Sequence, residues 1–289
     1  MFAKKLKNSM KNKKEIIVTG GSGFLGTSLI NSLQNNFKII SVDRKKSNLK
    51  KENLFFYKGI LKNFLSKHNL NNVKAIIHLA TSESRALMFQ KKPILANKNI
   101  DDMIYLLEKV KKSKKKIILF FASSRDIEKN NKRDIRDLYS FSKEYSENLI
   151  KIYSIDAKFI FYIVRIPDLY DYEISKNPKK KALYKIYTRL SKSQDLSITN
   201  PKHDFEYISR TLVSKKITDL LSKRNHKNTI LSLHGNKINI LKLVKKIMNK
   251  YKIKSTIQII KKVGKLNYKF KSYKLEKKLF LFNNLKNIT

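Results

Sequence analysis

The sequence contains no cysteine, and acidic residues are scarce: 22 Asp and Glu stand against 65 Lys and Arg in 289 residues. Without cysteine the chain has no disulfide framework, no thiol nucleophile and no thiolate metal site. No apolar run approaches the roughly 20 residues that span a bilayer. The first residues also lack the apolar core of a secretory signal. We therefore expect a cytoplasmic protein without a metal site.

The formal net charge of +43 is the most conspicuous property of the composition. The lysines are spread along the whole chain, which favours a solvated, compositionally biased surface. A field of this sign can also attract an anionic cofactor or substrate, and a field concentrated on one face can attract nucleic acid or an anionic membrane. Lysine is far commoner here than arginine, whose guanidinium makes bidentate phosphate and guanine contacts. We therefore expect no specific nucleic-acid partner and no membrane partner.

Residues 16–33 are the most informative stretch. Ile16 to Val18 predicts a buried strand, glycines follow at positions 20, 21, 23 and 26, and apolar residues then recur at helical spacing. A strand, a glycine turn and a helix place backbone N–H groups and a positive helix end against a diphosphate. Gly20 would allow the tight turn, Gly23 the approach of the phosphates, and Gly26 the packing of helix on strand. A plain turn is the alternative interpretation.

Strand patterns alternate with helical patterns along the chain. Strands are predicted at 37–42, 54–57, 73–80, 117–122, 159–164, 203–208 and 229–234, and helices at 100–110, 138–150, 182–190, 211–221 and 239–249. The alternation predicts an α/β fold with a Rossmann-like doubly wound parallel sheet, in which ligands bind beyond the carboxyl ends of the strands. We expect an NAD(P)-binding domain over 14–170, with returns around 203–234, and a smaller interleaved substrate lobe over 171–289.

Asp43 closes the second predicted strand, about 20 positions beyond the glycines. A carboxylate at this place can accept hydrogen bonds from the adenosine ribose, and it repels a 2′-phosphate, which favours NAD over NADP. Arg44 leaves NADP open, because a guanidinium can hold that phosphate. An ordinary aspartate in a turn is the alternative. His78, inside the fourth strand, is expected to be a packed and hydrogen-bonded residue rather than a ligand, because no second histidine lies at metal spacing.

Tyr139 and Lys143 lie four residues apart on a predicted helix and therefore share a face. An ammonium group stabilises a phenolate and lowers the pKa of the tyrosine from its reference value near 10. Such a tyrosine can take a proton from a substrate hydroxyl while hydride leaves the same carbon. Ser124, at the end of the preceding strand, can hydrogen-bond the reacting oxygen. A serine that caps a turn or helix is the alternative interpretation of Ser124.

Taken together, these residues resemble the extended short-chain dehydrogenase/reductase family, the NAD-dependent epimerase/dehydratases. The resemblance runs from about Glu15 to about Phe280. The matching pieces are Thr19-Gly-Gly-Ser-Gly-Phe-Leu-Gly26, Asp43, His78-Leu-Ala80, Asn99-Ile100, Ser123-Ser124, Tyr139-x-x-x-Lys143 and Arg165, with weaker echoes in His203-Asp-Phe-Glu-Tyr-Ile208 and Leu231-Ser-Leu-His-Gly235.

The resemblance implies an NAD(P)-dependent enzyme that acts on a nucleotide-activated sugar, as a 4-epimerase or a 4-keto-sugar reductase for surface polysaccharide precursors. It implies Ser124, Tyr139 and Lys143 as the catalytic trio. Members of the family are often homodimers through the helix that carries the tyrosine. The cofactor-binding residues that it implies are Gly20, Gly23, Phe24, Leu25, Gly26, Asp43, Arg44, Leu79, Ala80, Asn99, Tyr139 and Lys143.

Some residues depart from the family pattern. Ile60 stands where the family usually has an Asp that contacts adenine, and the interval from Ser124 to Tyr139 is short. Arg125-Asp126 replaces the continuation typical of sugar 4,6-dehydratases, which disfavours dehydration. These departures keep a second interpretation open, a catalytically retired protein that binds a dinucleotide as a sensor or scaffold. A third, a protein associated with RNA or DNA, depends on the charge alone.

Overall fold

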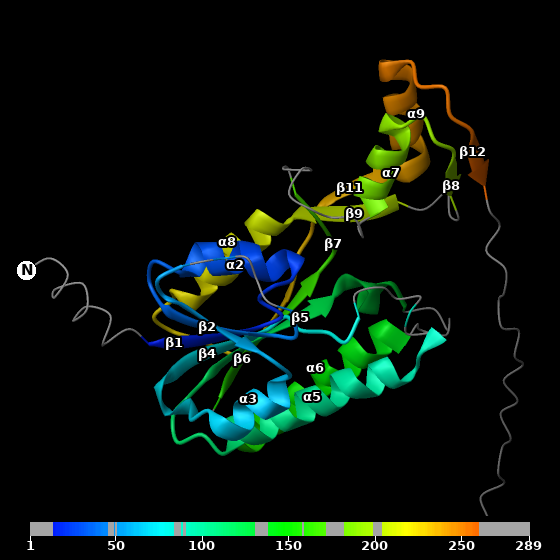
Figure 1. Ribbon diagram of the computed structural model, residues 1–289. Coiled ribbons are helices and arrows are strands. Elements are labelled where there is room, and N and C mark those ends of the chain that lie inside the picture. Colours follow the sequence, from blue (N-terminus) through cyan, green and yellow to red (C-terminus); the bar gives the residue numbers. More distant parts are fainter. Residues whose placement is uncertain are drawn as a thin grey trace, which may run out of the picture.

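The main sheet has seven parallel strands in the order β10-β6-β5-β4-β1-β2-β3 (Figure 1). The computed structural model describes residues 14–45, 49, 51–83, 88, 91–130, 138–157, 159–171, 182–198 and 204–259. The strands are β1 Glu15–Thr19, β2 Lys38–Asp43, β3 Leu54–Lys58, β4 Val73–His78, β5 Ile118–Ser124, β6 Ile160–Ile166 and β10 Thr229–Ser232. The predicted Rossmann-like α/β fold is thereby confirmed.

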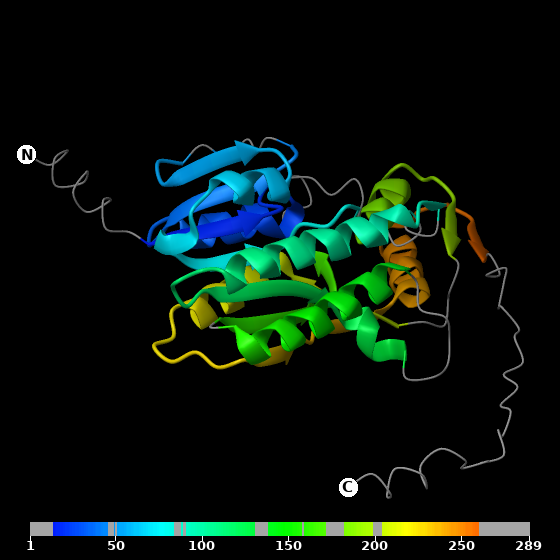
Figure 2. The ribbon, with the colours of Figure 1, turned by 90° about the horizontal axis from the view of Figure 1, so that it is seen from below.

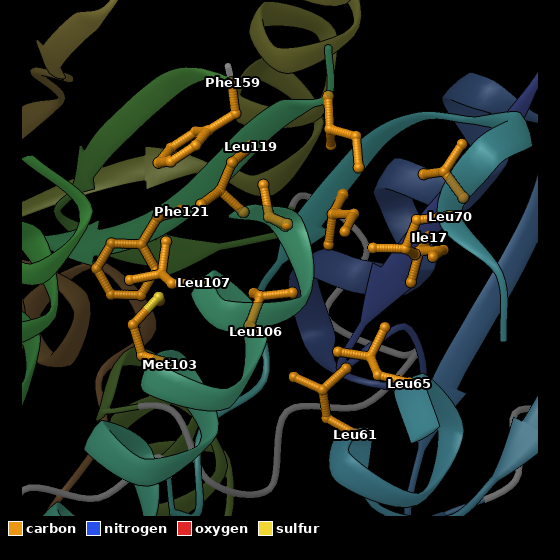
Figure 3. Packing of buried hydrophobic residues seen from close by; sticks show 14 of the residues in the cluster. Ile17, Leu61, Leu65, Leu70, Met103, Leu106, Leu107, Leu119, Phe121 and Phe159 are labelled. Carbon is orange, nitrogen blue, oxygen red and sulfur yellow. The ribbon is translucent and has the colours of Figure 1, made fainter. Parts of the chain in front are cut away.

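The central strands form because they are apolar on both faces, as buried parallel strands are. Successive side chains point to opposite sides of a strand. Ile17 therefore packs into one core with Leu65, Met103 and Phe121. Its two chain neighbours, Ile16 and Val18, belong to the core on the other side of the sheet. Figure 3 shows the core on the Ile17 side, where Leu106, Leu107 and Leu119 also meet.

Helices cover both faces of the sheet. α3 (Leu61–Lys67), α5 (Ile94–Lys111) and α6 (Leu138–Asp156) lie on one face, and α2 (Phe24–Leu33) and α8 (Arg210–Leu221) lie on the other (Figure 1). The predicted helix at 100–110 is longer in the structure, because α5 begins directly after Pro93, which its N-cap position tolerates. α3 was not predicted, since it spans only 7 residues.

A smaller lobe sits at the carboxyl end of the main sheet (Figure 2). It contains a three-stranded sheet, β11-β9-β7, and a two-stranded sheet, β12-β8. Its core joins Leu190, Tyr207 and Val244. The elements are β7 Asp168–Tyr170, α7 Ala182–Ser191, β8 Leu196–Ile198, β9 Asp204–Ser209, β11 Asn236–Asn239, α9 Ile240–Tyr251 and β12 Ile257–Ile259.

The chain passes between the two parts more than once. β9 belongs to the small lobe, the next helix, α8, packs beside α2 on the main sheet, and β10 then joins the sheet edge next to β6. The division at residue 170 stays a prediction. His203, residues 131–137 and the segment that ends at Phe280 lie outside the described residues. No helix in the described part of the chain is long and apolar enough to cross a membrane.

Candidate active site

The glycine turn between β1 and α2 has the geometry that its sequence predicts. Gly20 adopts φ +70°, and a Cβ added to it would lie 2.9 Å from the backbone nitrogen of Ala80. A Cβ on Gly26 would lie 2.3 Å from the carbonyl oxygen of Gly20. Gly23 is the N-cap of α2, and no side chain caps the helix there. The start of α2 therefore has backbone N–H groups and a positive helix end that no side chain caps, which is the geometry of an anion site.

Asp43 lies at the end of β2, against this turn. One carboxylate oxygen accepts a hydrogen bond from the backbone N–H of Ser22 at 3.1 Å, and the other accepts from the N–H of Lys45 at 3.1 Å. Arg44 reaches across to the segment after β4, where its guanidinium donates to the carbonyl oxygen of Ser82 at 3.1 Å. The carboxylate thus stands beside the glycine turn, where it would repel a 2′-phosphate.

His78 is a packed residue, as predicted. It is 3 % exposed, and its Nδ1 lies 2.8 Å from Oγ1 of Thr19. The same oxygen accepts a hydrogen bond from the N–H of Ala80 at 3.2 Å. Burial, followed by the charge of Lys143, lowers the pKa of His78 to about 3. The carbonyl and hydroxyl oxygens of Thr19, which accept from the N–H groups of Leu79 and Ala80, hold this segment against the end of β1.

Tyr139 and Lys143 share one face of α6, which points toward the end of β5. The Lys143 side chain is buried, and its Nζ donates to the carbonyl oxygen of Ala122 at 2.8 Å. It lies 4.7 Å from the ring centroid of Phe121 and 5.9 Å from that of Tyr139. Burial lowers the pKa of Lys143 to about 8, against the opposing effect of the Glu147 charge. At pH 7 the ammonium is therefore mostly charged and lies beside the tyrosine.

Ser124 ends β5, two residues beyond Ala122, whose carbonyl oxygen accepts from Lys143. Its Oγ accepts a hydrogen bond from the N–H of Asp126 at 3.2 Å and lies 3.3 Å from a carboxylate oxygen of the same residue. These bonds cap the short 3-10 helix η2 (Arg125–Asn130). The hydroxyl thus has the geometry of a serine that caps a turn, which is the alternative interpretation of Ser124. It also lies at the end of the strand, where the catalytic interpretation places it.

Asn99 links α5, the segment after β4, and α6. Its Oδ1 accepts from the N–H of Ser82 at 2.8 Å, and its Nδ2 donates to the hydroxyls of Thr81 and Ser142 at 3.2 Å and 3.3 Å. These bonds hold the segment after β4 next to the helix that carries Tyr139. The residue thus lies beside the segment that follows β4.

A chain of charged side chains near Ser124, with the buried Glu147 at one end, was not predicted. Glu147 is 1 % exposed and accepts two hydrogen bonds from the Arg165 guanidinium, at 3.0 Å and 2.7 Å, and one from the Ser123 hydroxyl at 2.5 Å. The hydrogen bond from Glu147 raises the pKa of Arg165 above its ordinary value. Glu147 follows Lys143 by four residues, so its position on the buried face of the helix was visible in the sequence. Its partners were not.

The chain of charges continues from Arg165 to the small lobe. Arg165 also contacts Glu128 of η2 at 3.2 Å, and Glu128 pairs with Arg125 at 2.9 Å. Arg125 then contacts Glu206 of β9 at 3.3 Å, and Glu206 accepts from the N–H of Gly235 at 2.8 Å. The segment that follows Ser124 is thereby fixed to the small lobe.

Arg210 is a second residue that the sequence did not single out. Its guanidinium donates to the carbonyl oxygen of Phe24 at 3.1 Å, lies 4.7 Å from the Phe24 ring, and pairs with Asp171. It also donates to Thr27 at 3.3 Å. The first turn of α2 is thus tied to the chain that follows β7.

A parallel doubly wound sheet, with a glycine turn leading into its first helix, defines a Rossmann-like α/β protein. The comparisons with known proteins give the family: the model of the NAD dependent epimerase/dehydratase family matches residues 16–209. The chain belongs to that family. As its name states, this is a family of NAD-dependent epimerases and dehydratases.

One curated relative and two solved structures show the range of the similarity. The chain is 25% identical over 278 residues to the bifunctional polymyxin resistance protein ArnA of Wigglesworthia glossinidia brevipalpis. The alignment covers 83% of this chain but only 42% of that protein. A UDP-glucose 4-epimerase with UDP-glucose from Thermotoga maritima superposes with a TM-score of 0.71 at 19% identity, over 90% of each chain. A UDP-glucuronic acid 4-epimerase from Bacillus cereus, in complex with UDP-glucuronic acid and NAD, gives 0.69 at 16% identity over 86% and 87% of the chains. These two similarities support the fold.

Proposed function

We propose that this protein is an NAD-dependent enzyme that epimerises a nucleotide sugar or reduces a keto derivative of one. The observation that carries the proposal is the buried ammonium of Lys143, fixed on Ala122 at the end of β5 and 5.9 Å from the Tyr139 ring. A buried lysine beside a tyrosine, at the ligand-binding edge of a parallel sheet, is the arrangement that general base catalysis needs. Surface polysaccharide precursors and a cytoplasmic location are the corresponding expectations.

The turn fits NAD because Gly20 and Gly26 leave no room for a side chain, and Gly23 leaves the helix start uncovered. Bound there, NAD would accept a hydride from the sugar and return it. The residues proposed to hold it are Gly20, Gly23, Phe24, Leu25, Gly26, Asp43, Arg44, Leu79, Ala80, Asn99, Tyr139 and Lys143. The carboxylate of Asp43 favours NAD over NADP. The calorimetry and turnover measurements below are repeated with NADP to test this preference.

The proposed proton path uses only groups of this chain. The Tyr139 hydroxyl takes the proton of the sugar hydroxyl as that carbon is oxidised, and gives it back on reduction. Lys143 favours the phenolate by its charge. Ser124 would hydrogen-bond the same sugar oxygen after its hydroxyl rotates from Asp126.

Tyr139→Phe tests the assignment with Tyr145→Phe as the matched control, because Tyr145 lies on the same helix and is 44 % exposed. Turnover is measured on UDP-glucose, UDP-N-acetylglucosamine and UDP-glucuronic acid, and NAD binding by calorimetry. Tyr139→Phe should lower kcat by about 10²-fold or more with unchanged NAD affinity, whereas Tyr145→Phe leaves both unchanged. Equal kcat values for Tyr139→Phe and the wild type would contradict the assignment.

The cofactor content of the purified protein separates the two reactions. An epimerase keeps its nicotinamide through the cycle, so stoichiometric bound cofactor supports epimerisation. Protein free of cofactor that oxidises NADH or NADPH in the presence of a 4-keto sugar supports reduction.

A dinucleotide sensor or scaffold is the second candidate. It is favoured by Ile60, which is 47 % exposed at the start of α3, and by the capping bonds of Ser124. This candidate predicts NAD binding by calorimetry and no turnover on any of the nucleotide sugars.

We also propose a homodimer through α6. Its solvent face carries Phe141, Ile152 and Ile155, which are 45 %, 60 % and 80 % exposed, and α5 lies beside it (Figure 2). An apolar stripe of this kind is typical of a helix that packs against a partner. Ile152→Glu should convert a dimer to a monomer in analytical ultracentrifugation. A monomeric wild type would contradict the proposal.

A further inference from the structure

A cavity of about 330 Å³ is lined by residues at the amino ends of the sheet strands. These strand ends lie at the left in Figure 1, opposite to the carboxyl ends where the candidate active site lies. Segments next to β1, β4, β5, β6 and β10 line the cavity, so it crosses most of the sheet. Strands of 5 to 7 residues separate it from the glycine turn and Ser124, which is a distance of roughly 20 Å. The lining residues are Lys14, Asn71, Asn72, Val73, Lys74, Lys115, Lys116, Ile118, Ile160, Lys223, Arg224 and His226.

The lining is strongly cationic. Lysine and arginine supply six of its twelve residues, and none of the twelve is an aspartate or a glutamate. Lys74 has a structural partner, because its Nζ donates to the carbonyl oxygen of Leu221, the last residue of α8, at 3.2 Å. Within the described part of the chain, the other five cationic side chains form no ion pair. A helix end carries about half a charge, which cannot balance this many cations.

The cations of the cavity disfavour one another. Burial, and after it the charge of Lys14, lowers the pKa of Lys74. Burial lowers the pKa of His226 as well, and the charges of Lys74, Lys223 and Lys116 lower it further. The local field is therefore positive inside the cavity, and an anion placed there would relieve the repulsion.

We propose that this cavity binds a compact anion with several phosphate groups, either free polyphosphate or the phosphate chain of a nucleotide. The charge favours such an anion over a monovalent one, since each added negative charge meets further unpaired cations. The volume lies within the range of small-ligand pockets. Asn71 and Asn72 can donate hydrogen bonds to phosphate oxygens, and the partly buried Ile160 adds an apolar side chain to the lining. The site is separate from the dinucleotide site and does not depend on the proposed function.

Calorimetry of the full chain with tripolyphosphate and with ATP, in buffer that holds physiological salt, tests the proposal against general attraction by a basic surface. Lys223→Gln/Arg224→Gln removes two charges from the lining. Lys215→Gln/Lys216→Gln removes two exposed charges from α8, and neither residue lines the cavity. Lys74 stays unchanged because it supports α8. The first variant should weaken tripolyphosphate binding by about tenfold and the control by less than about twofold, because exposed charges outside a site contribute little.

A second measurement reports on the cavity itself. The chain has 5 histidines, so the His226 ring can be assigned in a proton–carbon NMR spectrum by comparison with His226→Gln. Titration with tripolyphosphate should shift the His226 resonance and leave that of His78 in place, in the presence of saturating NAD. Tighter binding of ATP than of tripolyphosphate identifies a nucleotide as the ligand, and equal binding identifies the phosphate chain alone.

The proposal is overturned if both double variants weaken binding equally, if NAD displaces tripolyphosphate, or if single-stranded RNA binds while tripolyphosphate does not. Tyr139→Phe should bind tripolyphosphate as the wild type does. Absence of tripolyphosphate binding would therefore overturn the anion site without bearing on the proposed enzyme activity. Absence of enzyme activity would likewise not bear on the anion site.

Discussion

The ion pair between Arg165 and Glu147 gives the sharpest stability prediction. Glu147 is 1 % exposed and receives hydrogen bonds of 3.0 Å and 2.7 Å from the guanidinium. Arg165→Met would remove both and leave a buried carboxylate that keeps only one of its described hydrogen bonds, from the Ser123 hydroxyl, and the more distant charge of Lys143. Breaking one side of a buried pair costs about 3–5 kcal/mol. This is a large part of the roughly 5–15 kcal/mol that stabilises a typical domain.

The matched control is a pair of the same length that is less buried. Lys38 and Glu15 lie 2.6 Å apart, close to the 2.7 Å of the Arg165 pair, but the Lys38 side chain is 37 % exposed and Glu15 has His68 at 3.3 Å as a second partner. Lys38→Met leaves the buried Glu15 carboxylate with His68 as a partner, so it should lower the free energy of unfolding by less than Arg165→Met does. The contrast between the two variants tests whether an exposed cation and a second partner reduce the cost at a buried carboxylate.

The assay is urea unfolding followed by circular dichroism, with the m-value checked for constancy. Glu147→Gln/Arg165→Met removes the charge together with its partner and keeps an acceptor for Ser123, so it should recover about 2 kcal/mol or more relative to Arg165→Met. The reasoning is refuted if Arg165→Met costs no more than Lys38→Met, or if the double variant is as unstable as the single one.

Three further predictions follow from the site. Lys143 should titrate with a pKa of about 8, so one lysine resonance in a proton–carbon spectrum should move between pH 7 and 9. This resonance should be missing in Lys143→Gln. Titration of every lysine above pH 10 would contradict the burial argument. His78 has a pKa lowered to about 3, so the unfolded chain binds the extra proton below pH 6.5 and stability falls as the pH drops. Between pH 7 and pH 5 this residue should cost about 2 kcal/mol in urea unfolding, and His78→Gln should remove that part of the pH dependence. Gly26→Ala places a Cβ 2.3 Å from the carbonyl oxygen of Gly20, so NAD affinity in calorimetry should fall by about tenfold or more; an unchanged affinity would show that the turn does not hold the cofactor.

The sequence contained the information for the main sheet because that information is local. Runs such as Ile16 to Val18 are apolar on both faces, and Leu29, Ile30 and Leu33 recur at helical spacing, so each element can be identified from its own side chains. The glycine spacing likewise anticipated the positive φ of Gly20. Short elements such as α3 and β7 escaped prediction, since 3 to 7 residues carry too little periodicity.

The candidate site divides in the same way. Tyr139 and Lys143 could be paired from the sequence because the helix itself sets their four-residue spacing. The burial of Lys143 on Ala122 and its lowered pKa could not be predicted from the sequence, because both depend on β5 lying beneath α6. Similarly, the sequence identified Ser124 as a candidate, and only the structure revealed the bonds with Asp126 that occupy its hydroxyl.

The sequence by itself determined the longer elements of the main sheet, the glycine turn and the four-residue spacing of Tyr139 and Lys143. The tertiary structure alone decided the partners of the charges. Arg125 meets Glu206 across 81 residues of chain, and Lys74 meets the end of α8 across 147. Periodicity acts over one turn of a helix or two residues of a strand, whereas an ion pair or a cationic cavity arises only when the packed sheet brings distant segments together.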